Sequence, residues 1–219
     1  MRDTVGLITA SRDPDVSPPR SHIVRTRDGN RWLLCASLSA VERKRLGAIL
    51  SVQPRASDPA DAESYPFDLG AIGRALAVVA PLVRPYRGPA FSFPDELPSS
   101  DRAELLTDLR EAPREGPFAW LRSARDPSHP IAIVRADSGD VASVCYSARS
   151  TSAAAEAGVE TREEHRGRGY GSAAVLTWSA AVRQSGRVPL YSTEWENTAS
   201  RALASRLGLL WYAEDLQIR

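Results

Sequence analysis

The chain has 219 residues, of which 42% are hydrophobic and 25% charged, a composition typical of one globular domain or of one domain with a smaller partner. This composition excludes a fully disordered chain, a collagen and a coiled coil, and no uninterrupted apolar run reaches the ~20 residues of a membrane span. Its 28 basic and 27 acidic residues give a net charge of +1, which argues against bulk electrostatic binding to nucleic acid or to an anionic membrane.

The N-terminal part begins with a segment rich in proline and charged residues, over 1–20, which predicts a flexible lead-in without a signal peptide. Two apolar or β-branched runs follow at 22–27 and 31–38. They are joined by Asp28-Gly29-Asn30, a typical turn sequence, and therefore predict a β-hairpin.

Helical signals come next. Ser39 and Glu42 have the spacing of a capping box, which predicts a helix that continues to about Ser51. An acidic, proline-containing stretch over 53–66 predicts a loop, and a second helix is predicted over about 68–83.

The C-terminal part alternates strand and helix patterns. A short strand or an extended arm is predicted over 88–94, and Asp101 with Glu104 predicts a capped helix to about Arg110. Further strands are predicted at 131–136, 141–148, 154–161 and 188–193, helices at 170–185 and 197–207, and one or two closing strands at 209–219. This order indicates a mixed α/β layout.

Cys35 and Cys145 both lie in apolar, strand-like runs and do not have the spacing of metal ligands. We interpret them as reduced core residues, which predicts a cytoplasmic protein without a metal site.

The most informative stretch extends from Val159 to Ser172, where a predicted strand enters a glycine-rich turn and the turn opens a helix. Glycine allows the backbone to approach an anion closely, and the free N–H groups of the first helical turn are directed at such an anion. Arg166 and Arg168 add positive charge. The stretch therefore predicts a site for a phosphate group.

Two common phosphate motifs do not fit. A P-loop needs a lysine directly after its glycines, and the only lysine is Lys44. A dinucleotide fingerprint needs another glycine spacing and two parallel βαβ halves, although Glu194 could serve as its acidic residue. A solvated arginine- and glycine-rich loop remains the simplest non-functional interpretation.

The run Arg166-Gly167-Arg168-Gly169-Tyr170-Gly171 resembles the Arg/Gln-x-x-Gly-x-Gly/Ala motif of the GNAT superfamily of acyl-CoA-dependent N-acyltransferases. After the following helix and strand, the resemblance continues in Asn197-Thr198-Ala199-Ser200-Arg201-Ala202-Leu203 and in Arg206-Leu207-Gly208-Leu209. It covers about 130–219, fits 88–130 loosely and does not extend to 1–87.

The resemblance implies an α/β fold with a mixed sheet of the GNAT type. The expected organisation is a lead-in over 1–20, an N-terminal α/β extension over 21–87 and an acetyltransferase domain over 88–219.

The resemblance also implies how acetyl-CoA binds. Backbone groups of Val159 and Thr161 would pair with the pantetheine arm as an additional strand does, and Asn197 would lie near that arm, where the strands at 154–161 and 188–193 separate. Ser200 would support the start of the last helix. The pyrophosphate would be held by the amides of Arg166, Gly167, Arg168, Gly169, Tyr170, Gly171 and Ser172.

The implied reaction is transfer of the acetyl group to a primary amine. An amine with a pKa of about 10.4 is present as free base in only about one molecule in a thousand at neutral pH, so a proton acceptor is needed. Glu160 is the first candidate because it lies in the strand that would hold the acyl group, Glu156 is the second and Glu194 the third. Strand alternation and any β-bulge decide which of them face the substrates.

The general acid departs from the family pattern. Many members have a tyrosine after the leucine of the last helix, and the matching position here is Ala204. Tyr191 or Tyr212 is the candidate replacement, with packing as the alternative role. We therefore expect catalysis to depend on positioning, a carboxylate-activated water and a displaced tyrosine.

The acceptor, an unidentified small molecule or protein, is not encoded in any motif we find. A non-catalytic acyl-CoA-binding or sensing module is the first alternative, supported by Ala204, and a nucleic-acid-associated protein is the second. We expect no nucleic-acid or membrane partner, while the choice between monomer and homodimer stays open. Trp195 is expected in the core, with an acceptor pocket as the alternative.

Overall fold

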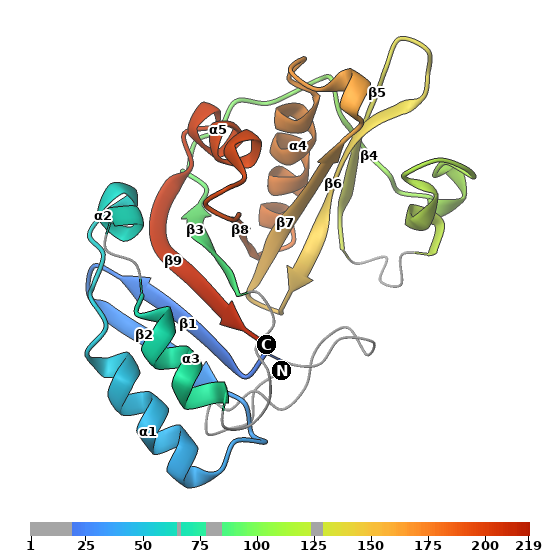
Figure 1. Cartoon of the computed structure of the whole chain (residues 1–219). Coiled ribbons are helices and arrows are strands. Elements are labelled where there is room, and N and C mark those ends of the chain that lie inside the picture. The colour runs from blue at the N-terminus through green and yellow to red at the C-terminus, as the bar shows by residue number, and fades with distance from the viewer. Residues whose placement is uncertain (1–18, 65–66, 78–84, 124–128) are drawn as a thin grey trace. The chain divides into compact units, whose positions relative to one another are not determined.

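The computed structural model describes residues 19–64, 67–77, 85–123 and 129–219 (Figure 1). The chain divides into two compact units. The first contains the chain up to Ala90 together with Thr193–Thr198 and Trp211–Arg219, and the second contains Phe91–Ser192 and Ala199–Leu210. Most of the predicted lead-in and the last part of the helix predicted over 68–83 lie outside the described residues.

The first unit is built on the predicted hairpin, which is confirmed. Strands β1 (Ser21–Thr26) and β2 (Gly29–Leu34) pair antiparallel, with Ile23 opposite Trp32. Gly29 has a φ of +135°, a backbone conformation that residues with a Cβ atom rarely adopt. This explains why the turn contains a glycine.

The helices of this unit cover the hairpin (Figure 1). Helix α1 (Ala40–Ser51) has the predicted capping box, because the Ser39 side chain accepts from the Glu42 amide and the Glu42 side chain accepts from the Ser39 amide. Helix α3 (Leu69–Ala77) follows. The core between helices and strands is formed by buried apolar residues, including Ile23, Leu34, Leu38, Leu46, Leu50, Ile72, Leu76 and Leu216.

The last strand of the chain, β9 (Leu210–Ile218), also belongs largely to this unit. It pairs antiparallel with β1, with Ile23 opposite Leu216, and β3 (Tyr86–Ser92) lies on its other side, which gives the order β2-β1-β9-β3. The sequence left open whether 209–219 forms one strand or two, and it forms one.

The loop predicted over 53–66 contains a short helix, α2 (Pro59–Ser64). It is anchored by two arginines, because the carbonyl of Ala62 accepts from Arg25 Nη2 at 2.7 Å and from Arg87 Nη2 at 2.8 Å. The sequence analysis missed a local signal for this helix, because Asp58 Oδ1 accepts from the Asp61 amide at 2.8 Å and Pro59 is the first helical residue.

The second unit has the strand order β8-β7-β6-β5-β4, with β7 and β8 parallel and the other neighbours antiparallel. The sheet is therefore mixed, as predicted. Its longer strands match the predicted ranges closely: β5 (Ile131–Arg135), β6 (Val141–Ser150), β7 (Ala154–Thr161) and β8 (Val188–Ser192).

The helix predicted from Asp101 to Arg110 is wrong. The segment contains strand β4 (Glu104–Leu105), which pairs with β5, and a 3-10 turn, η1 (Leu109–Glu111), capped by Asp108. The cross-strand pairing satisfies backbone groups that a helix would have used, so tertiary pairing overrides the local capping pattern.

Two apolar cores cover the two faces of this sheet. In β5, Ala132 and Val134 belong to the core with helix α4 (Tyr170–Gln184), whereas Ile131 and Ile133 belong to the core with Phe118 and Leu121. Alternate residues of a strand point to opposite faces, so β5 is buried on both sides. Figure 1 shows α4 against β5, β6 and β7.

Helix α5 (Thr198–Arg206) begins directly after Asn197, as predicted. Among the described helices, none has the length and the apolar run that a membrane crossing requires. Cys35 and Cys145 are both buried and free, as predicted for core thiols.

Candidate functional site

Strands β7 and β8 pair over only part of their length. The register joins Ala154 to Val188, Ala155 to Pro189 and Glu156 to Leu190, and it extends no further among these fully described strands. Beyond Glu156 the backbone of β7 is paired with β6 but leaves its other edge free. The strands therefore part at the place the resemblance implies, and residues 157–161 offer unpaired backbone groups.

The two faces of β7 differ in chemistry. Ala155 and Ala157 belong to the core with α4, whereas Glu156, Gly158 and Glu160 alternate with them on the opposite face. A register irregularity between Ser147 and Arg149 lies in β6 rather than in β7, so the alternation within β7 is preserved.

The glycine-rich turn has the backbone conformation that its glycines allow. Gly167 has a φ of +75° and Gly169 a φ of +82°, and Gly169 directly precedes the first residue of α4. Both angles lie in the left-handed region, where a Cβ atom is strained. The turn thus requires glycine at these two positions.

Gly171, in the first turn of α4, is required for a different reason. A Cβ atom there would lie 3.2 Å from Thr161 Oγ1, 3.3 Å from Leu203 Cδ1 and 3.7 Å from Val159 Cγ2. Glycine therefore lets the start of α4 pack closely against the end of β7 and against α5.

The start of α4 presents free backbone donors. The first bond of the helix is donated by the Ala173 amide to the Gly169 carbonyl at 3.1 Å, so the N–H groups of Tyr170, Gly171 and Ser172 come before it. The Ser172 Oγ atom is buried and has no hydrogen-bond partner among the described residues. Free amides, a buried hydroxyl and left-handed glycines at a helix N-terminus fit a bound phosphate group.

Arginines surround this turn. Arg166 and Arg168 are exposed, as a charged ligand would need. Arg102 reaches the turn from the segment before β4, donates to the Arg168 carbonyl at 3.2 Å and lies over the Tyr170 ring at 4.8 Å. Sequence reasoning missed Arg102 because it is 66 positions from its acceptor and lies in no motif.

Glu160 is held by a tyrosine that the sequence analysis did not single out. Tyr146 Oη donates to Glu160 Oε1 at 3.0 Å. Burial of the Tyr146 side chain, with a smaller effect of the Glu160 charge and hydrogen bond, raises the pKa of Tyr146 to about 12. Tyr146 therefore stays protonated and remains a donor to Glu160 at physiological pH.

Glu156 is engaged in an ion pair. Its Oε1 atom accepts from Arg149 Nη2 at 2.6 Å, from Arg149 Nε at 3.1 Å and from Ser192 Oγ at 2.9 Å. Glu160, four residues further along the same strand and on the same face, has no cationic partner among the described residues. The two glutamates thus have different surroundings.

Tyr191 lies in the interior, with 2% of its surface exposed, and shares a hydrogen bond of 2.5 Å with Ser200 Oγ. Burial is the main reason that the pKa of Tyr191 is raised, although the bond to Ser200 lowers it in part. Ala204 is buried in the same core cluster. The structure thus joins Tyr191 and Ser200, which sequence reasoning treated separately.

The remaining predicted residues, Glu194 and Asn197, belong to the first unit. The Asn197 amide donates to the Glu194 carbonyl at 3.1 Å, immediately before α5. Trp195 is buried and donates from Nε1 to Glu214 at 2.7 Å, so it is a core residue, as expected.

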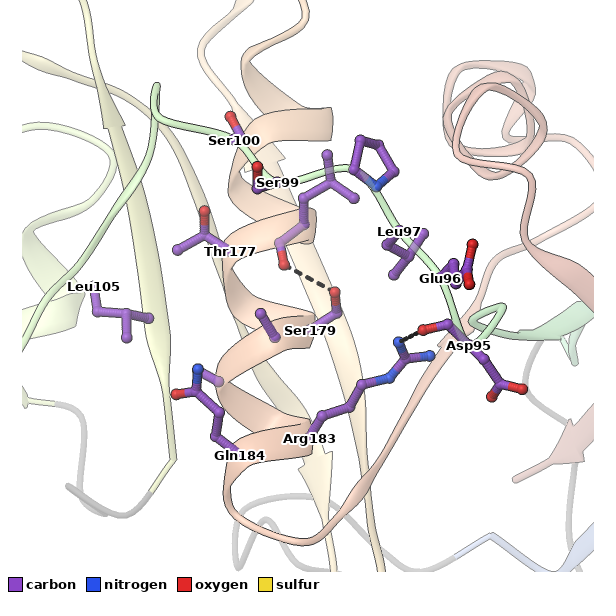
Figure 2. A pocket seen from close by; sticks show the side chains of 14 residues that line it. Asp95, Glu96, Leu97, Ser99, Ser100, Leu105, Thr177, Ser179, Arg183 and Gln184 are labelled. Carbon is purple, nitrogen blue, oxygen red and sulfur yellow. Dashed lines mark hydrogen bonds between the residues drawn. The ribbon is translucent and has the colours of Figure 1, made fainter.

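A pocket of about 770 Å³ lies along the C-terminal half of α4 (Figure 2). Leu97, Leu105 and Leu176 line it together with hydroxyl groups such as those of Ser99 and Thr177. Arg183 Nη1 donates to the Asp95 carbonyl at 2.7 Å (Figure 2), so the guanidinium is hydrogen-bonded within the chain. None of the predicted site residues lines this pocket.

The sequence model of the FR47-like protein family matches residues 133–216. This range contains the parting strands, the glycine-rich turn and α4. No curated protein matches the chain.

Solved structures match at low sequence identity. A GCN5-related N-acetyltransferase-like protein from Streptococcus suis is 18% identical with a TM-score of 0.52, over 92% of this chain and 84% of that one. A GNAT-family acetyltransferase from Novosphingobium aromaticivorans is 22% identical with a TM-score of 0.48, over 63% of this chain and 66% of that one. An acetyltransferase from Salmonella typhimurium, solved with acetyl-CoA, is 20% identical with a TM-score of 0.37, over 46% of this chain and 69% of that one.

The Streptococcus suis structure shows that the chain has the fold of that N-acetyltransferase-like protein. The family match adds the segment that contains the run from Arg166 to Gly171. Residues 133–216 therefore match the FR47-like protein family model, and the fold of the chain is that of the Streptococcus suis protein.

Proposed function

We propose that the protein transfers an acetyl group from acetyl-CoA to a primary amine. The observation that carries this proposal is the arrangement at the end of β7, where a free strand edge leads into a glycine-rich turn and the N-terminus of α4. A strand edge accepts an extended amide-containing ligand, and a helix N-terminus accepts phosphate.

The cosubstrate would bind along this path. The backbone of Val159 and Thr161 would pair with the pantetheine amides. The amides from Gly167 to Ser172 would hold the pyrophosphate, whereas the Arg166 amide, which the sequence also suggested, donates to the Glu163 carbonyl at 3.1 Å. Arg166, Arg168 and Arg102 would add charge, while Asn197 and Ser200 keep the roles that the resemblance implies. Acetyl-CoA supplies the activated acyl group, and the chain supplies its orientation.

Glu160 is our candidate for the proton acceptor. It is exposed and lies in the strand that would hold the acyl group, whereas the Oε1 atom of Glu156 is occupied by Arg149 and Ser192. Glu156 is therefore proposed as a positioning residue, and Glu194 is the third candidate.

The reaction balances without a further reagent. The acceptor ammonium gives one proton to Glu160, directly or through water, and the free amine forms a bond to the acetyl carbonyl carbon. The carbon–sulfur bond then breaks, the nitrogen loses its second proton, and the thiolate of CoA takes up a proton. The net products are the N-acetylated amine, CoA and one proton.

Tyr191 is our candidate for the donor of the proton to the thiolate, through Ser200. The two hydroxyls are 2.5 Å apart, and Ser200 lies at the start of α5. Burial keeps Tyr191 protonated, which a general acid requires. Ala204 leaves the usual family position without a donor.

A thermal-shift titration with acetyl-CoA and with CoA tests cosubstrate binding. Ligand at 100 times its dissociation constant stabilises a protein by about 2.7 kcal/mol. We expect this shift for the wild type and its absence in Gly169→Glu, which places a carboxylate at the anion site. Gly139→Glu is the matched control, because Gly139 also has a positive φ, +87°, with no atom within 4 Å of its Cβ position.

Assays of thiol release with a panel of amines then separate the proposal from its alternative. Binding of acetyl-CoA without turnover of any amine would favour an acyl-CoA-binding module, for which the buried Ala204 is the specific observation. No shift at millimolar acetyl-CoA would overturn both.

The charge and the cysteines of the chain support proposals about its partners and its location. We propose acetyl-CoA and an amine as the only small-molecule partners, and no nucleic acid, because the net charge is +1. A cytoplasmic location is proposed from the two free cysteines, since oxidising compartments favour disulfides.

A further inference from the structure

A cluster of two aromatic rings and one carboxylate lies beside the free part of β7. Trp120, from the 3-10 turn η2 (Ala119–Ser123), meets Tyr146 edge-on, with ring centroids 4.8 Å apart and an interplanar angle of 72°. Tyr146 donates to Glu160 at 3.0 Å. We call Trp120, Tyr146 and Glu160 the aromatic–acid cluster.

The sheet itself positions this cluster. Tyr146 and Gly158 are directly opposite each other in the β6–β7 pair. A Cβ atom at Gly158 would lie 2.7 Å from Tyr146 Cζ, so the phenol ring lies directly on the backbone of β7 and only glycine leaves space for it. The ring and the carboxylate are therefore held by strands rather than by a mobile loop.

The cluster is open to solvent and has an uncompensated negative charge. Trp120 is 38% exposed, and Glu160 is exposed. Among the described residues Glu160 has no ion-pair partner, whereas Glu156 on the same face is paired with Arg149. The ionisable groups that act on Tyr146 are Glu160 and the buried Cys145 thiol, and neither is a cation.

A carboxylate next to exposed aromatic rings is the chemistry that binds an organic cation. We propose that the aromatic–acid cluster is the acceptor subsite and takes the ammonium group of an alkylamine that has no carboxylate near its amine. This inference rests on the proposed function, because it names the substrate class for the same site. A carboxylate close to the amine would be repelled by Glu160.

Binding of the cation is tested without acetyl-CoA. Tetramethylammonium chloride is titrated into the wild-type protein while the indole N–H resonance of Trp120 is followed by NMR, assigned as the one missing in Trp120→Phe. We expect a saturable shift, and at least fivefold weaker binding in Glu160→Gln. Asp137→Asn, which removes an exposed charge elsewhere, is the control variant and should bind tetramethylammonium as the wild type does. tert-Butanol, the neutral analogue of the probe, should not bind to the wild-type protein.

Turnover gives the second readout. We expect n-butylamine to have a KM at least tenfold lower than 4-aminobutanoate, and Trp120→Leu to raise the KM for n-butylamine at least fivefold with a smaller change in kcat. Because 38% of the Trp120 surface is exposed, we expect Trp120→Leu to remain folded.

The outcomes separate this inference from the proposed function. Acetyl transfer without a saturable tetramethylammonium shift, or with an unchanged shift in Glu160→Gln, would overturn the subsite and leave the activity. A Glu160-dependent shift in a protein that does not bind acetyl-CoA would overturn the acetyltransferase and leave a cation site.

Discussion

At the scale of single residues, the two glutamates of β7 show how the surroundings assign roles. Both project from the same face, yet Glu156 is bound by Arg149 and Ser192, whereas Tyr146 is the one side chain bound to Glu160 in the part of the chain that the structure describes. A proton acceptor needs a free lone pair and an accessible position, and the exposed Glu160 is therefore the proposed acceptor.

Replacing the proton acceptor should reduce turnover strongly. We expect Glu160→Gln to lower kcat by about 100-fold or more, the usual range for loss of a general base. Glu156→Gln should change kcat/KM by less than about fivefold, because a partly exposed ion pair contributes at most about 1 kcal/mol. Steady-state kinetics measures both, and equal effects of the two variants would remove Glu160 from its assigned role.

The raised pKa of Tyr146 predicts that the stability of the protein depends on pH in the alkaline range. Its pKa is raised to about 12 by burial and by Glu160, above its ordinary value of 10.0. The folded state then retains a proton that the unfolded state loses, so the free energy of unfolding falls as the pH rises from about 10 to 12.

The matching measurement compares wild type and Tyr146→Phe by urea denaturation at several pH values. We expect the wild type to be the more stable at pH 8, and the difference in the free energy of unfolding between the two proteins to become smaller above pH 10. A gap that stays constant up to pH 12 would contradict the raised pKa.

At the scale of elements, local signals and tertiary pairing compete. The capping box at Ser39 and Glu42 forms as the sequence indicates, whereas the similar pattern at Asp101 and Glu104 does not start a helix. The difference is that Glu104 and Leu105 find a strand partner in β5.

The cap of α1 should contribute measurably to stability. Ser39→Ala removes the acceptor of the Glu42 amide and should cost about 1 kcal/mol. The hydrogen bonds with Ser39 lower the pKa of Glu42, so the contribution of this carboxylate is present above its ordinary pKa of 4.5 and is lost as the pH falls through the lowered value. Urea denaturation at pH 7 and at pH 3 measures both, with Ser51→Ala at the other end of α1 as the control.

At the scale of the whole molecule, a buried charge network joins the two ends of the chain within the first unit. Arg25 and Glu214 are both fully buried, with Arg25 Nη2 2.5 Å from Glu214 Oε2. Glu214 Oε1 also lies 2.7 Å from Arg87 Nε in an ion pair and accepts a hydrogen bond from Trp195 Nε1 at 2.7 Å. Desolvation is the largest influence on Arg25 and lowers its pKa, while Glu214 opposes this.

Removing one partner from this network should therefore strongly destabilise the folded protein. Glu214→Gln leaves the Arg25 charge buried without its counterion, and we expect a loss of about 3–5 kcal/mol in the free energy of unfolding. Glu104→Gln, which breaks the exposed pair with Arg135, should cost no more than about 1 kcal/mol. Urea denaturation followed by tryptophan fluorescence compares the two, and similar losses would show that burial does not control the cost.

The sequence by itself determined the elements whose signals lie within a few residues of one another. The Asp28-Gly29-Asn30 turn, the Ser39 cap, the glycines at 167 and 169 and the glycine after α4 each depend on local backbone conformation, which neighbouring residues control. The proposed phosphate-binding stretch is of this kind, because a strand, a turn and a helix N-terminus are consecutive in the chain.

The tertiary structure alone decided the contacts between distant positions. Tyr146 reaches Glu160 across 14 residues, Arg102 reaches the turn across 66, and Arg25 meets Glu214 only because β1 pairs with β9. Such contacts depend on strand register and on the space left by residues such as Gly158, and neither has a local pattern in the sequence. The proposed cosubstrate site could therefore be located from one segment, whereas the surroundings of Glu160 required the assembled sheet.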